Sequence, residues 1–167
     1  MNELDDFAVP VRLRTIVISF VLALLLDLMP FPFEMFFWLP EWTALTLLYW
    51  SLHRPQWSGM GVAFVLGLLV DVGTAASLGL HALSYTVMVF FVLRYRRQIM
   101  LYGYAMQIFA VLAALLCNQT VLVAARLFLN HQIITWHSLL APVSGALVWP
   151  LFSQILMMFS ASSRRIR

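Results

Sequence analysis

Long apolar stretches, separated by short polar segments, occupy almost the whole chain. Six stretches can be traced, at 13–29, 36–52, 59–72, 80–93, 104–129 and 139–160. They are continuously apolar and do not alternate with polar residues, which favours helices over the strands of a membrane barrel. A bilayer core about 30 Å thick requires roughly 20 apolar residues per helix. The pattern therefore predicts an all-α, polytopic membrane protein whose single domain is a six-helix transmembrane bundle with short loops.

The composition agrees with this prediction. Hydrophobic residues make up 63% of the 167 residues, charged residues only 10%, and the mean hydropathy is +0.91. A soluble domain has an apolar share of roughly 45 to 50%. We therefore exclude a soluble domain and interpret the chain as an integral membrane protein.

The arginines predict how the chain is oriented. If the six stretches alternate across a membrane, nine of the ten arginines lie on one side of it: Arg12, Arg14, Arg54, Arg94, Arg96, Arg97, Arg164, Arg165 and Arg167. Because positive residues near span ends stay in the cytoplasm, both termini are expected to be cytoplasmic. The net charge of +3 reflects this topology, and we do not interpret it as nucleic-acid binding. The first stretch lacks a small-residue cleavage site and is expected to be retained as a signal anchor.

The segment 59–93 leaves two topologies open. Each of its arms is only about 15 residues long, which gives roughly 22 Å of helix and barely crosses a bilayer. The segment either crosses the membrane twice or forms a re-entrant hairpin. The arginines on its two sides do not decide, because both topologies return the chain to the same side.

Four acidic residues lie in or beside the apolar stretches: Asp27, Glu34, Glu41 and Asp71. An ionised carboxylate in a span costs about 2.5 to 3.5 kcal/mol near its centre, so it is normally kept for a reason. Asp71 follows Gly67 by one helical turn and precedes a turn that ends at Gly79, and small residues allow helices to approach closely. Two interpretations of Asp71 stay open: a helix cap or inter-helix hydrogen bond, or a direct contact with a partner.

Arg126 is the one arginine that breaks the positive-inside pattern. We predict that it forms an ion pair with Asp27 or Asp71 in the outer half of the bundle. The alternative is that its side chain extends to the outer surface with its stem in lipid.

No metal, cofactor or catalytic site is predicted. His81, His131 and His137 could lie at the outer face with Asp71, but their spacing does not suit a metal site. The serines Ser84, Ser144 and Ser153 have no histidine partner in register for nucleophilic catalysis, so an enzyme is not expected. The single cysteine, Cys117, excludes an internal disulfide and is expected to serve packing.

Prolines and aromatic residues gather in the outer connection between the first two stretches. Pro30, Pro32, Pro40 and Trp42 belong to this segment, which is interpreted either as an interfacial aromatic belt or as a partner-binding surface. Pro40 with Glu41 suits the start of a helix. In the last stretch, Trp149-Pro150 is expected to kink the helix, because proline removes a backbone hydrogen bond.

The order of these motifs resembles the rod shape-determining protein MreD family of Gram-negative bacteria. The motifs are Met29-Pro30-Phe31-Pro32, Pro40 with Trp42, Leu47-Leu48-Tyr49-Trp50, Gly67 and Asp71 followed by Leu78-Gly79, and Trp149-Pro150. The resemblance covers nearly the whole chain, in length as well as in motif order.

This resemblance implies a non-enzymatic component of the cell-elongation machinery, or elongasome, in the bacterial inner membrane. Such a component maintains rod shape by linking peptidoglycan synthesis to cytoplasmic actin-like MreB filaments. The implied partners are MreC and, indirectly, the RodA glycosyltransferase with its transpeptidase partner. The implied fold is similar to the six-helix substrate-binding subunits of vitamin transporters, which is an analogy of fold and not of function.

The resemblance and the residues together give a set of candidates for partner binding or structure. These are Asp71, Gly67, Gly79, Asp27, Arg126, Pro30, Pro32, Pro40, Trp42, Tyr49, Trp50, Trp149 and Pro150. The alternative function is a small transporter or a substrate-binding membrane subunit, for which Asp71 beside a glycine-rich turn is the supporting feature.

With loops this short, partners are expected to bind mainly to helix faces inside the bilayer. The small-residue faces are Ala63 with Gly67, Ala75 with Gly79, Ala110 with Ala114, and Ala141 with Gly145. Most of these pairs are expected to serve internal packing. Membrane lipid is the other expected contact, while stoichiometry, homo-oligomerisation and binding of a lipid-linked cell-wall precursor stay open.

Overall fold

The computed structural model describes residues 13–29, 39–101, 103–130 and 140–162, and within these ranges the chain is helical without strands. The helices are α1 (Leu13–Asp27), α3 (Trp42–His53), α4 (Met60–Gly73), α5 (Leu80–Leu101), α6 (Tyr104–Asn130) and α7 (Leu140–Ser162). The all-α prediction is therefore confirmed for the described residues.

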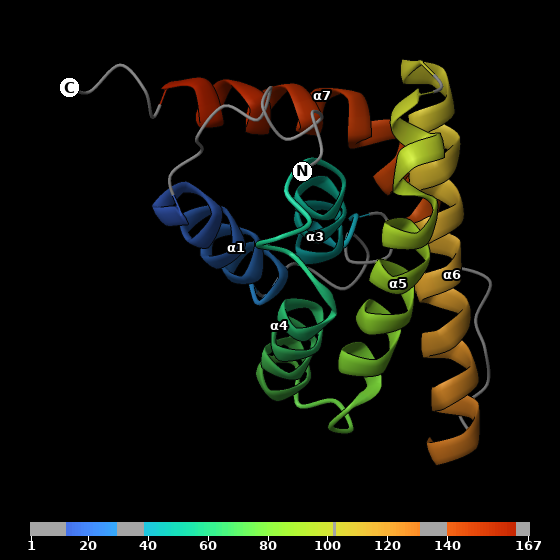
Figure 1. Ribbon diagram of the computed structural model, residues 1–167. Helices are drawn as coiled ribbons and strands as arrows, with labels where there is room; N and C mark the ends of the chain where they lie inside the picture. The colour runs from blue at the N-terminus through green and yellow to red at the C-terminus, as the bar shows by residue number, and fades with distance from the viewer. Residues whose placement is uncertain (1–12, 30–38, 102, 131–139, 163–167) are drawn as a thin grey trace.

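Helix α3 is the centre of the fold. In Figure 1 it lies between α1, α4, α5 and α7. All of its residues from Thr43 to Leu52 are buried, whereas a helix at the surface buries only one side. The large side chains of Tyr49 and Trp50 are 3% and 1% exposed and fill the space between α3 and its neighbours. Helix α3 packs on α1 and α5 and, less extensively, on α7, so it forms the buried centre of the fold.

The remaining helices follow one another in space as they do along the chain. The most extensive packing is between α4 and α5, followed by α5 with α6 and then α6 with α7, while α1 packs on α3. Figure 1 shows α5 and α6 side by side as two long helices. Helices α1 and α3 form one helical hairpin, and α4 and α5 form a second. In each hairpin the end of the first helix lies beside the start of the second.

Helix α5 is longer than the sequence predicted. The apolar stretch ends at residue 93, but the helix continues to Leu101 and includes Arg94, Arg96 and Arg97. Arginine is a good helix former, so it ends the apolar stretch without ending the helix. The Nε of Arg96 donates a hydrogen bond to the Leu52 carbonyl oxygen at the end of α3, which ties the extension to the centre of the fold.

Helix α7 contains Pro150 within its length. In Figure 1 this helix changes direction and its final part runs across the top of the view towards α1. A bend is expected where proline removes a backbone hydrogen bond, so the fold agrees with the kink predicted from Trp149-Pro150.

Among the residues that the structure describes, two helices are long and apolar enough to cross a membrane: Ala105–Phe128 within α6 and Leu140–Ser160 within α7. Helix α4 is apolar as well but has only 14 residues. Apolar side chains also cover much of the outside of the other helices; α1, for example, buries Ile16 and Phe20 but exposes Val17, Val21 and Leu25. Large exposed apolar patches mark surfaces that contact membrane or partner proteins.

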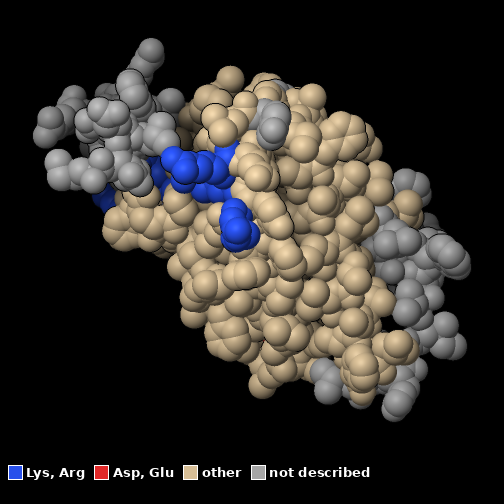
Figure 2. Space-filling model, turned by 45° about the vertical axis from the view of Figure 1, so that its right-hand side comes forward, with Lys and Arg blue, Asp and Glu red and all other residues tan. Residues whose placement is uncertain are grey.

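Figure 2 shows one face of the molecule, which is covered almost entirely by uncharged side chains. Blue arginine side chains gather towards one end of this face, and no acidic side chain of the described residues is visible on it. A belt of uncharged residues with arginines at one end is the distribution expected of a protein whose arginines stay on one side of a membrane.

Candidate functional site

Asp71 lies in the last turn of α4 and is completely buried. One carboxylate oxygen accepts hydrogen bonds from the backbone N–H of His81 at 3.0 Å and from the His81 ring Nδ1 at 2.7 Å. The other accepts from the backbone N–H of Gly79 at 2.8 Å and of Ala82 at 3.4 Å. The N–H groups of His81 and Ala82 belong to the first turn of α5, where no intrahelical acceptor is available, and that of Gly79 directly precedes the helix. Asp71 therefore caps α5 from the preceding helix.

Two glycines allow this cap to form. A side chain on Gly67 would place its Cβ 2.4 Å from the backbone N and Cα of Ala82, so α4 and α5 meet backbone against backbone at this point. Gly79 has a φ of +99°, a conformation that glycine adopts readily, and it turns the chain so that its N–H reaches Asp71. The fold thus brings together Gly67, Asp71 and Gly79, which the sequence had singled out separately.

Asp27 is the last residue of α1 and performs the same task for α3. Its two carboxylate oxygens accept the backbone N–H groups of Trp42 at 2.9 Å and Thr43 at 2.7 Å. Glu41 occupies the N-cap position of α3, but its own side chain makes no capping hydrogen bond. The carboxylate needed at this helix start is supplied by Asp27 from α1.

The ion pair predicted for Arg126 is not formed. Within the described ranges the one ion pair between side chains joins Asp71 to His81, and the carboxylate of Asp27 faces the start of α3. The N-terminus of a helix carries a partial positive charge and free N–H donors, which can take the place of an arginine beside a carboxylate. The prediction that Arg126 pairs with Asp27 or Asp71 is therefore wrong, and Arg126 lies half-buried on α6.

Glu41 instead joins three helices. Its Oε2 accepts a hydrogen bond from Asn118 Nδ2 on α6 at 2.9 Å and a longer one from Tyr85 Oη on α5 at 3.4 Å. Tyr85 and Asn118 are 1% and 2% exposed, and the Oδ1 of Asn118 has no hydrogen-bond partner among the residues that the structure describes. Sequence reasoning missed both residues. The available signal was Asn118 beside Gln119 in the middle of the longest apolar stretch.

The structure describes one of the three candidate prolines of the outer connection. Pro30 and Pro32 lie outside the described residues. Pro40 is buried and lies two residues before the first helical residue of α3, so it precedes the helix and does not form its first turn. It lies close to the position that a Cβ on Gly145 of α7 would occupy, at 3.6 Å. Pro40 thus packs at the joint between α3 and α7.

The remaining aromatic candidates are packing residues. Trp50 Nε1 donates a 2.8 Å hydrogen bond to Ser19 Oγ on α1, and the Tyr49 ring lies edge-on to Trp50 with centroids 5.1 Å apart. Tyr49 also packs against the completely buried Trp149 of α7, with centroids 6.4 Å apart. Trp42 contacts the Phe152 ring of α7 at 5.8 Å. These five aromatic residues hold α1 and α7 onto α3.

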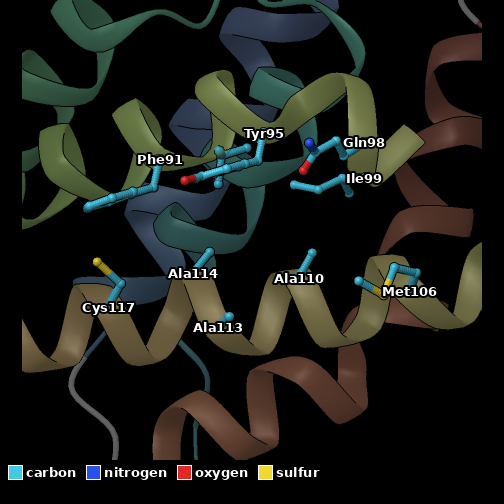
Figure 3. Close-up of a pocket in the computed structure, with 10 residues that line it drawn as sticks. Phe91, Tyr95, Gln98, Ile99, Met106, Ala110, Ala113, Ala114 and Cys117 are labelled. Atoms are coloured by element: carbon cyan, nitrogen blue, oxygen red, sulfur yellow. The ribbon is translucent and has the colours of Figure 1, made fainter. Parts of the chain in front are cut away.

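A slot of about 460 Å³ lies between α5 and α6. Figure 3 shows Phe91, Tyr95 and Gln98 of α5 on one side of it and Ala110 and Cys117 of α6 on the other. The predicted small-residue pair Ala110 with Ala114 lies in this lining, and this pair leaves space where larger residues would fill it.

A metal centre has no counterpart in the part of the chain that the structure describes, where no three His, Cys, Asp or Glu side chains are grouped. His131 and His137 lie outside that part. His81 is engaged with Asp71 as described above.

Comparison with known proteins gives the chain its family. A family model for the rod shape-determining protein MreD matches residues 11–159. Among curated proteins, the Rod shape-determining protein MreD of Haemophilus influenzae (strain ATCC 51907 / DSM 11121 / KW20 / Rd) is 27% identical over 136 residues, which cover 81% of this chain and 84% of that protein. No solved structure matches the chain. The match over nearly the whole chain confirms what the motif order predicted: this protein belongs to the MreD family of rod shape-determining membrane proteins.

Proposed function

We propose that the protein is a non-enzymatic membrane component of the bacterial cell-elongation complex, which links peptidoglycan synthesis to cytoplasmic MreB filaments. Its direct partner is the transmembrane helix of MreC, and through MreC it reaches RodA and the transpeptidase. Membership of the MreD family supports the role in rod shape. The choice of an adaptor over an enzyme rests on what the buried polar groups do.

The observation that carries this proposal is that each of the three carboxylates described above, of Asp27, Glu41 and Asp71, is engaged inside the fold. Asp27 and Asp71 cap the starts of α3 and α5, and Glu41 holds Asn118 and Tyr85. Catalysis requires a nucleophile or base that faces a substrate. Carboxylates that are occupied by helix starts and neighbouring side chains instead build a rigid scaffold, and this suits an adaptor.

What the scaffold offers to a partner is the apolar outside of its helices. Val17, Val21 and Leu25 form one exposed stripe on α1, and α7 exposes Leu151 and Ile155. Inside a bilayer, helices recognise each other by such faces through close packing. A partner's transmembrane helix lying against α1 or α7 is therefore the mode of binding that we propose.

The topology proposed is six spans in the inner membrane with both termini in the cytoplasm. The gathering of arginines at one end supports it. Helix α4 spans only about 21 Å with its 14 residues. Labelling of the 73–79 turn from each side of the membrane tests whether α4 and α5 cross fully or form a re-entrant hairpin.

A transporter is less well supported, because the space beside Glu41 and Asn118 is small. This hollow, lined also by Ala141 and Pro142, has a volume of about 10 Å³, which is about the room for a single water molecule. A vitamin or comparable solute needs roughly 300 Å³ or more, together with a few convergent polar groups. The slot of about 460 Å³ between α5 and α6 is large enough, but it is lined mainly by apolar side chains. The proposed similarity to vitamin-transporter subunits is thus one of fold.

The experiment that tests the function is depletion of the protein in its own host, with cell width and incorporation of cell-wall label followed by microscopy. The proposal predicts that rods swell and that label along the sidewall becomes dispersed. Cells that remain rod-shaped and acquire only a nutrient requirement would support the transporter instead. Co-purification of tagged protein with MreC, and of two differently tagged copies, tests partner binding and homo-oligomerisation.

A further inference from the structure

The side chains that line the slot between α5 and α6 differ from one end to the other. At one end it is lined by Phe91 and Cys117, and at the other by Gln98, Ile99 and Met106, with Tyr95 between the two ends. Arg94 lies beside Tyr95, with its guanidinium 5.9 Å from the centre of the Tyr95 ring. An apolar space with a polar side chain at one end and an arginine beside it matches a molecule that has an apolar chain and an anionic head.

The length of the slot argues for one leaflet of lipid. On α6 the lining runs from Met106 to Cys117, a distance of about 16 Å at 1.5 Å per residue. That is about half of a hydrocarbon core roughly 30 Å thick. A transmembrane helix of a partner would need a groove across the full thickness, whereas the acyl chain of a lipid in one leaflet fits the observed length.

The positive charge beside the slot favours anionic over zwitterionic lipids. Arg94 is exposed on α5 beside Tyr95, and Figure 2 shows arginines gathered towards one end of the molecule with no described acidic side chain visible on that face. Basic pockets between membrane helices bind the head groups of anionic lipids, and each arginine contributes about fivefold to the affinity near an anionic surface. A zwitterionic head group gains much less from the same site.

We propose that the α5–α6 slot is a binding site for an anionic phospholipid, whose acyl chain lies between the two helices from Tyr95 towards Cys117 and whose phosphate is held at Arg94 and Gln98. This site is independent of the carboxylates and of the partner helix proposed above. Its occupant would fill the space beside Ala110 and Ala114 and so stiffen the contact between α5 and α6.

Native mass spectrometry of the purified full-length protein tests this proposal, with equimolar phosphatidylglycerol and phosphatidylcholine added in detergent. The expected result is that phosphatidylglycerol is retained about fivefold more than phosphatidylcholine. Ala110→Phe, which fills the slot, should abolish retention of both lipids. Arg94→Gln should abolish the preference and leave equal retention of the two lipids.

Matched control variants separate the slot from the general surface. Ala124→Phe places the same ring on an exposed position of α6 beyond the slot. Arg97→Gln removes a charge two residues from Tyr95, on the opposite side of α5. Both controls should retain phosphatidylglycerol as the wild type does. If Ala110→Phe fails to fold by circular dichroism, Ala113→Leu replaces it, because Ala113 is also in the lining.

The single cysteine gives a second readout, since Cys117 lines the slot. Phosphatidylglycerol should slow its modification by methyl methanethiosulfonate, and phosphatidylcholine should do so much less. Equal retention of the two lipids by the wild type, or equal loss with Arg94→Gln and Arg97→Gln, would overturn the proposal. Oxidative cross-linking of two copies through Cys117 would overturn it as well, because the slot would then be an interface between copies.

Discussion

Asp27 and Asp71 lie at the ends of α1 and α4, the first helices of two helical hairpins. Each accepts backbone N–H groups from the start of the helix that follows. The two joints differ in their support. Asp71 is completely buried, receives the His81 ring in addition to backbone groups, and lies one turn after the contact of Gly67 with the backbone of Ala82. Asp27 is half-buried and faces two backbone donors, Trp42 and Thr43.

This difference shows where the fold is least tolerant. At the α4–α5 joint the chain has no space for a further carbon atom, and a buried carboxylate has replaced water as the acceptor for several donors. At the α1–α3 joint, Asp27 and one of its two donor residues, Trp42, are only half-buried. The loss of a buried acceptor leaves donors unsatisfied, which costs more than the loss of an accessible one.

The largest effect is expected for Gly67→Ala. Its Cβ would lie 2.4 Å from backbone atoms of Ala82, which cannot move aside as a flexible side chain can. We expect a loss of at least about 1 to 3 kcal/mol in the free energy of unfolding, with little folded protein recovered. Size-exclusion chromatography with fluorescence detection measures the folded fraction.

Gly61→Ala is the matched control, because the Cβ at Gly61 on the same helix meets nothing within 4 Å. It should fold as well as the wild type. Equal behaviour of the two alanine variants would contradict the close contact between α4 and α5.

Asp71→Ala is expected to have the next largest effect. It leaves the first N–H groups of α5 and the His81 ring without their acceptor in a buried place, at a cost of about 1 to 3 kcal/mol. Thermal unfolding of the purified protein measures the loss. A melting temperature equal to that of the wild type would show that Asp71 is not the cap that holds α5.

Asp27→Ala should cost less, about 1 kcal/mol, as is typical for the loss of a helix N-cap. The same thermal measurement places the two aspartates on one scale. The comparison between the joints fails if Asp27→Ala lowers the melting temperature as much as Asp71→Ala does.

The smallest effect is expected for His81→Phe, which removes the ring hydrogen bond but leaves the backbone donors of α5 with Asp71. The expected loss is about 0.5 to 1.5 kcal/mol. In a double-mutant cycle with Asp71→Ala, the effect of His81→Phe should largely disappear, because the two side chains act through one contact. Strict additivity of the two losses would argue that His81 has a separate role.

The helices and the importance of the glycines could be predicted from the sequence, because long apolar stretches and small residues report directly on local structure. The capping role of Asp71 was one of two interpretations, and the contacts of its carboxylate support that one. The ion pair of Arg126 was predicted wrongly, since a search for opposite charges overlooks helix starts as partners for carboxylates.

The contact of Glu41 with Asn118 was beyond the reach of pattern reasoning. The two residues are 77 positions apart and meet only because α3, α5 and α6 converge. The extension of α5 to Leu101 was missed for another reason. The run of apolar residues stops at the first arginine, whereas arginine still favours a helix.

The most direct test of the account is to replace the cellular copy with Asp71→Asn, Asp27→Asn or Gly67→Ala and to measure cell width together with the amount of folded protein in the membrane. We propose that the aspartates stabilise the scaffold and that the scaffold is required for rod shape. Width should therefore follow the folded amount on one curve for all three variants and for a titrated wild type. Round cells that contain wild-type amounts of folded Asp71→Asn protein would contradict it, and would make Asp71 a direct contact with a partner.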